Sequence, residues 1–176
     1  MELQEAIENR RSIRRFKPDK VKNSIIKQLI NAARLAPSSK NRQPWMFYIA
    51  RKDVKQNIVK IMKTWYENNK NEKTSVLGTA MVIEQAPVLI LVFRNADNKL
   101  ERSDTLSIGA AIEHILLKAT ELNLGSLWIA DTAYVNDEIS KLVNTNLELF
   151  SAIAIGYADE TPAARPRKKL KEITFN

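Results

Sequence analysis

DTLSIGAAIEHILLKATELN, residues 104–123, carries apolar side chains on nearly every face of a helix. Ile108, Ile112 and Ile115 are among them. A helix on the surface of a globular protein confines its apolar residues to one stripe. This segment therefore predicts a helix that is buried on most sides, in a core or against a partner subunit. Gly125 follows closely, where a C-terminal cap is expected.

Strands are predicted on both sides of this helix, because β-branched and aromatic residues gather in short runs. The predicted strands are residues 45–50, 87–94, 126–130 and 151–157. The run 87–94 is apolar almost throughout, which is typical of a central strand covered on both faces.

Further helices are predicted from apolar residues at helical spacing, over residues 2–9 and 24–35. Two more are expected to begin at Asp53 and Asn136, whose side chains suit the N-cap position. The polar stretch 66–75 is predicted to be a mobile loop that could gate a site.

Length and composition indicate one domain over residues 1–176, with 44% hydrophobic residues and no cysteine. The lack of cysteine excludes disulfides, thiol nucleophiles and thiolate metal sites, and fits a reducing cytoplasm. The N-terminus has no secretory signal. The apolar run 86–93 is far shorter than the roughly 20 residues that cross a bilayer. We therefore expect a soluble, cytoplasmic protein with no membrane partner.

The net charge of +8 raises two possibilities, a nucleic-acid partner or a small anionic cofactor. The lysines are spread evenly, and no nucleic-acid-binding module is recognisable, so we expect no nucleic-acid partner. No histidine and carboxylate cluster has metal-ligand spacing, so no metal is expected. The only histidine, His114, lies inside the apolar helix and is expected to be a hydrogen-bonded structural residue.

Three polar or cationic segments point to an anionic ligand: RRSIRRF at 10–16, PSSKNRQPW at 37–45 and RPRKK at 165–169. The four glycines are too scattered for a glycine-rich phosphate loop. Arginine side chains would then hold a phosphate, since the guanidinium donates paired hydrogen bonds to its oxygens. The neutral donors and acceptors of 37–45 suit a polar ring system.

In this order along the chain, the three segments resemble the FMN-dependent nitroreductase family, over about residues 3–173. The resemblance implies an α+β fold with a mainly antiparallel central sheet flanked by helices, in an intertwined homodimer. Residues 159–176 form a tail whose apolar Leu170, Ile173 and Phe175 are expected to dock on the partner subunit.

The resemblance also implies the residues that bind FMN. Arg10 would bind the phosphate with help from Arg11, Ser12 the ribityl chain, and Arg14 the ring edge. The loop would reach the flavin, typically from the opposite subunit, through Pro37, Ser38, Ser39, Asn41 and Gln43. Arg165 and Arg167 would close on the phosphate, and the backbone of Ile129 and Ala130 would lie beside the ring. Many family members have a glycine shortly after the tryptophan, where this chain has Ala130-Asp131.

The implied activity is that of an oxidoreductase that uses NADH or NADPH to reduce nitroaromatic, quinone or similar small-molecule acceptors. In this ping-pong scheme the flavin N5 carries the hydride, so no catalytic side chain is expected. Two alternatives remain. One is a specialised flavoenzyme of the same fold, of the dehalogenase or flavin-degrading type. The other is a module without turnover, for flavin storage or binding of nucleic acid.

Overall fold

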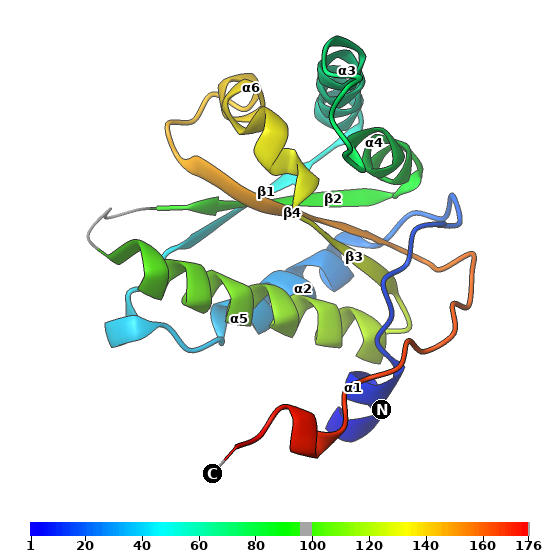
Figure 1. The fold of residues 1–176 in the computed structure, drawn as a ribbon, viewed down its shortest axis with the longest axis vertical. Helices are drawn as coiled ribbons and strands as arrows, with labels where there is room; N and C mark the ends of the chain where they lie inside the picture. Colours follow the sequence, from blue (N-terminus) through cyan, green and yellow to red (C-terminus); the bar gives the residue numbers. More distant parts are fainter. Residues whose placement is uncertain (96–99, 176) are drawn as a thin grey trace.

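The centre of the fold is a four-stranded antiparallel sheet with strand order β1-β2-β4-β3 (Figure 1). The computed structural model describes residues 1–95 and 100–175. The strands are β1 (Trp45–Ala50), β2 (Val88–Arg94), β3 (Gly125–Ile129) and β4 (Glu148–Gly156). All four predicted strands are confirmed, and the predicted α+β class with them.

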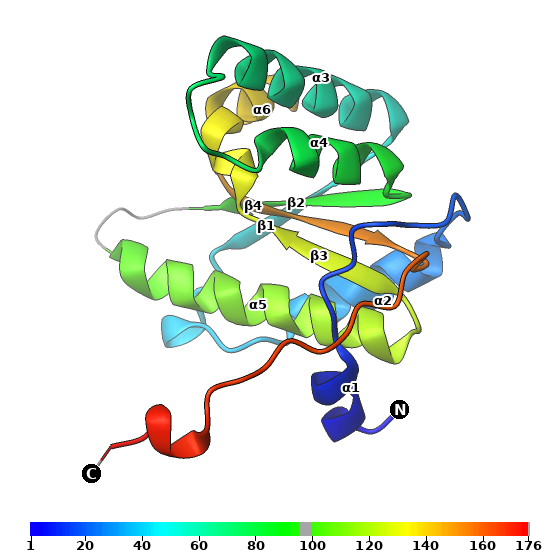
Figure 2. The same cartoon turned by 45° about the vertical axis from the view of Figure 1, so that its right-hand side comes forward.

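Helices cover both faces of the sheet (Figures 1 and 2). On one face lie α3 (Lys52–Asn68), α4 (Val76–Gln85) and α6 (Asn136–Leu142), and on the other lie α2 (Asn23–Arg34) and α5 (Glu101–Glu121). Strand β2 is buried at every position, and its alternate side chains enter two different cores. Leu89, Leu91 and Phe93 join the core under α3 and α4, whereas Val88, Ile90 and Val92 join the core over α2 and α5.

The long apolar helix exists as α5, and it begins at Glu101, three residues before the predicted start. Its buried positions recur every three or four residues and pack against α2 and β3. Leu106 lies on its outer side with 67% of its surface exposed. His114 Nδ1 lies 3.1 Å from the carbonyl oxygen of Ala32, a contact that joins α5 to α2 and agrees with a structural role.

Three predicted helix caps are wrong by one or two residues. Asp53 is the second residue of α3 and Asn136 the first residue of α6, and neither supplies a capping side chain. After α5, Asn123 takes the left-handed conformation (φ 57°) that we had expected of Gly125. Gly125 instead begins β3, where a Cβ atom would lie 2.9 Å from the side chain of Ile13.

Two segments differ from the sequence prediction. Residues 66–68 of the expected loop form the last turn of α3. Helix α4 follows at Val76, in a segment to which the sequence analysis assigned no element.

No helix within residues 1–95 and 100–175 combines the length and the apolar content that a membrane span needs.

The tail leaves β4, passes α1 (Leu3–Asn9) and ends in a short 3-10 helix, η4 (Leu170–Glu172) (Figures 1 and 2). Its three apolar side chains stay exposed in the single chain: Leu170 by 78%, Ile173 by 60% and Phe175 by 98%. Residue 176 of the predicted tail lies outside the described residues. These exposed apolar side chains form a surface that a second molecule could cover.

Candidate functional site

The arginine segment, residues 10–16, packs against the beginning of β3 and against the chain that follows β4. After α1, residues 12–17 run alongside the start of β3 and the chain that leaves β4. The Ile13 N–H donates to the Ser126 carbonyl at 2.9 Å, and the Lys17 N–H donates to the Tyr157 carbonyl at 2.9 Å. These backbone hydrogen bonds thus hold the beginning of the chain against residues of its last third.

The carboxylate of Glu160 stabilises this arrangement. Glu160 Oε1 accepts hydrogen bonds from the backbone N–H groups of Arg14 and Arg15, the latter at 3.1 Å. Its other oxygen lies 3.4 Å from Arg15 Nε. The hydrogen bond from the Arg14 amide is the main cause that lowers the pKa of Glu160, because it stabilises the ionised form. The tail is therefore tied to the arginine segment where it begins.

A cavity of about 560 Å³ opens where the tail passes the arginine segment. Both ends of the chain line it, with Ile7, Glu8, Arg10, Arg11, Ser12 and Arg14 from one end and Pro162, Ala163, Ala164, Arg165 and Arg167 from the other. The five predicted phosphate- and ribityl-binding residues are therefore brought together, and Arg14, predicted to contact the ring edge, lies beside them. Lys168 does not line this cavity.

Positive charge exceeds negative charge in this cationic cavity, which has five arginines and one glutamate. Arg11 Nη1 donates to the carbonyl oxygens of Glu8 (2.6 Å) and Arg10 (2.9 Å) at the end of α1. Arg10 Nε lies 3.7 Å from Glu113 of α5, a partner with an exposed side chain. Among residues 1–95 and 100–175, no carboxylate forms an ion pair with Arg165 or Arg167. Such a surplus suits a phosphate group.

A second cavity, of about 390 Å³, lies at the C-terminal end of β3. Its lining comes from β3 and the residues after it, from α4 and from the arginine segment: Leu127, Trp128, Ile129, Ala130, Asp131, Ser75, Gly78, Thr79, Val82 and Arg14. The predicted Ile129 and Ala130 thus lie on a cavity wall. Arg14 lines both cavities.

Sequence analysis assigned no role to the α4 side of this β3 cavity. Asp131 accepts hydrogen bonds from the Ser75 hydroxyl at 2.6 Å and from the Thr79 hydroxyl, which ties the start of α4 to the end of β3. The one available signal was that Ala130-Asp131 stands where many family members have a glycine shortly after the tryptophan. Ser75 and Thr79 gave none, because a hydroxyl next to a polar stretch is common on any surface.

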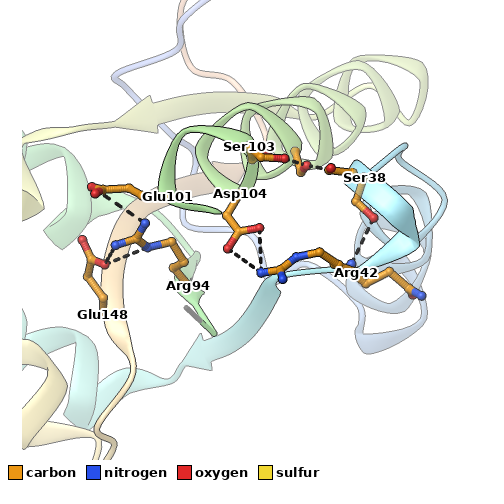
Figure 3. A network of polar contacts seen from close by, with 10 residues as sticks. Ser38, Arg42, Arg94, Glu101, Ser103, Asp104 and Glu148 are labelled. Atoms are coloured by element: carbon orange, nitrogen blue, oxygen red, sulfur yellow. Dashed lines mark hydrogen bonds and ion pairs between the residues drawn. The ribbon is translucent and has the colours of Figure 1, made fainter. Parts of the chain in front are cut away.

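The proline-bracketed loop lies elsewhere in the chain. It holds the short helix η1 (Ser39–Asn41) and packs against the beginning of α5 (Figure 3). The predicted residues Pro37, Ser38, Ser39, Asn41 and Gln43 line neither cavity. One chain therefore does not bring this loop to the other predicted site residues.

A model of the nitroreductase family matches residues 7–157. The chain belongs to the nitroreductase family.

Individual relatives align with nearly the whole length of this chain. An iodotyrosine deiodinase from Thermotoga neapolitana is 29% identical, over 96% of this chain and 95% of the relative. YfhC of Bacillus subtilis, named provisionally as an NAD(P)H nitroreductase, is 25% identical over 97% and 91%. A Desulfovibrio desulfuricans protein, provisionally called a nitroreductase and solved in complex with FMN, is similar in structure with a TM-score of 0.82. It is 26% identical, and the alignment covers 100% of this chain and 96% of that one.

Proposed function

We propose that this nitroreductase-family protein is an FMN-dependent oxidoreductase that uses NAD(P)H to reduce nitroaromatic, quinone or similar acceptors by a ping-pong hydride mechanism. The observation that carries the proposal is that Arg14 lines both cavities. One cavity offers surplus positive charge, and the other offers apolar walls beside a strand end. A ligand with a phosphate at one end and a flat ring at the other matches this pair.

The residues present fit FMN. Arg10, Arg165 and Arg167 would hold the phosphate, while Ser12 would contact the ribityl chain. The ring would lie in the β3 cavity, beside Ile129 and Ala130. Bound there, FMN supplies the hydride chemistry at its N5 atom.

The chain's own contribution is binding and orientation. Arg14 places a positive charge between the two cavities, where it would stabilise negative charge on the edge of the ring. Trp128 Nε1 donates to Ser151 Oγ at 2.6 Å, and that hydroxyl donates to the Ile129 carbonyl at 2.7 Å. These two bonds fix the backbone that faces the ring. No side chain needs to act as nucleophile or general acid in this scheme.

The proposal includes a homodimer in which the loop 37–44 and the tail cross to the partner. The loop lies outside both cavities of its own chain, so a second chain would supply it. The exposed Leu170, Ile173 and Phe175 provide apolar surface for the exchange. Each flavin would then lie between two chains.

The proposal is tested by FMN titration of the purified protein and its variants. Arg10→Ala and Arg167→Ala should each weaken binding by about 1.5–3 kcal/mol, roughly 10- to 150-fold, the scale of a charge-assisted hydrogen bond. Lys168→Ala is the matched control, because it removes a neighbouring charge that does not line the cavity. Equal affinity in all three variants would show that the phosphate lies elsewhere, and wild-type protein that takes up no FMN would refute the proposal.

The similarity to the Thermotoga deiodinase favours a second candidate, a reductive dehalogenase of the same fold. Anaerobic bleaching of the bound flavin by NAD(P)H separates either enzyme from a storage protein. A parallel assay with a nitroaromatic, a quinone and an iodophenol then distinguishes the two. Halide release without turnover of the first two acceptors would replace the main proposal with the second candidate.

A further inference from the structure

The backbone of the loop 37–44 is unusual because three of its residues adopt left-handed conformations without being glycine. These are Lys40 (φ 53°), Asn41 (φ 54°) and Gln43 (φ 50°). Residues with a Cβ atom disfavour this region, and such conformations persist only where the surroundings impose them. Something must therefore hold the loop in this shape.

Bonds within the loop account for part of it. The Asn41 N–H donates to the Ser38 carbonyl at 2.9 Å, and the Gln43 N–H donates to the Ser38 hydroxyl at 3.0 Å. The Ser39 N–H reaches Ser107 Oγ of α5 at 3.3 Å. These are single hydrogen bonds between neutral groups, and each contributes less to stability than a bond to a charged group.

The strongest attachment is an ion pair between Arg42 and Asp104, in the first turn of α5 (Figure 3). Arg42 Nη2 lies 3.1 Å and 3.3 Å from the two carboxylate oxygens. Asp104 is only 1% exposed, and a buried carboxylate without its cation is strongly unfavourable. Arg42 therefore has to turn inward, and its exposed neighbours Asn41 and Gln43 face solvent.

We infer that Arg42 and Asp104 are positioning residues for the flavin site: their ion pair holds the strained loop in the shape that presents Asn41 and Gln43 to FMN. Neither residue would touch the cofactor. The inference rests on the proposed function, because it assumes that the loop contacts FMN. Without the pair the loop would sample other conformations, and affinity would fall in proportion to the fraction of correctly shaped loops.

The decisive variant is Arg42→Met/Asp104→Leu, which replaces both charges by apolar side chains of similar size. Replacing a buried ion pair in this way is often neutral for stability, so the variant should fold with a Tm close to that of the wild type. Hydrogen exchange of the 41, 42 and 43 amides, measured without FMN, should become at least about tenfold faster, and FMN should bind about tenfold more weakly. Asp104→Asn, which keeps the shape of the side chain, should change both readouts in the same direction and serves if the double variant does not fold.

Glu148→Gln is the matched control. It weakens a neighbouring ion pair, that of the buried Arg94 with Glu148, without touching the loop (Figure 3). Its Tm should fall while exchange of the loop amides and FMN affinity stay at wild-type values. Unchanged exchange or unchanged FMN affinity in the double variant would overturn the inference. If the wild type bound no FMN, the proposed function would fail, and exchange in the FMN-free variants would still show whether the pair holds the loop.

Discussion

Gly125→Ala should both destabilise the fold and weaken the cofactor site. A Cβ atom at position 125 would lie 2.9 Å from both Cγ atoms of Ile13, well inside normal contact distance. Ile13 is 7% exposed, and its N–H is bonded to the Ser126 carbonyl, so it has little room to retreat. Overpacking of this kind costs about 1–3 kcal/mol, which lowers the Tm of a domain of this size by about 2–12 °C. Any shift of Ile13 also moves its neighbours Ser12 and Arg14, so FMN should bind more weakly.

Thermal and urea unfolding of the FMN-free protein measure the first effect, and FMN titration measures the second. Gly78→Ala is the control for stability, because a Cβ atom there meets no atom within 4 Å. It lies inside α4 and should be neutral or up to about 1 kcal/mol more stable. If Gly125→Ala were as stable as Gly78→Ala, the close packing of Ile13 on β3 would be refuted.

Two further predictions concern the tail. The pKa of Glu160 is lowered in the folded state, so its contribution to the free energy of unfolding is present near neutral pH and lost as the pH falls below its usual value of 4.5. Glu160→Gln should thus be less stable than the wild type at pH 7, and the difference should shrink in urea unfolding at acid pH; a constant difference would mean that the bonds to Arg14 and Arg15 do not depend on the charge. Ile173→Ser/Phe175→Ser should leave a single chain intact but weaken the dimer by about 1.5–3 kcal/mol for each side chain that the partner buries. Sedimentation velocity over a concentration series measures this, and a wild-type monomer of 20.1 kDa at every concentration would contradict the exchange.

The strands could be predicted from sequence because their composition and their environment agree. Trp45–Ala50 was found with its exact limits, and the apolar run of β2 reflects two covered faces. Val76–Gln85 was missed because β-branched residues, a glycine and apolar side chains on most sides hide the helical period. At the end of α5, both Asn123 and Gly125 can adopt a left-handed conformation, and only packing against Ile13 decides between them.

The cationic cavity could be predicted only through the family resemblance. Arginine pairs near each end of a chain are ordinary surface features, and no local pattern says that Arg14 meets Glu160 across 146 residues. Arg42 and Asp104 are 62 residues apart, and each resembles any charged residue of a soluble protein. Their partnership follows from how the loop and α5 pack, which no spacing rule encodes.

The residues that line the cationic cavity are synthesised at opposite ends of translation. Arg10–Arg14 leave the ribosome at the start of synthesis, whereas Arg165 and Arg167, which complete the lining, are made last. At a synthesis rate of about 5–20 residues per second, roughly 7–30 s separate the synthesis of Arg10–Arg14 from that of Arg165 and Arg167. A nascent chain that ends before Arg165 could not hold a phosphate from both sides of the cavity. Tight FMN binding would therefore require a released chain that includes Arg167, and a chain truncated before Arg165 should bind FMN more weakly.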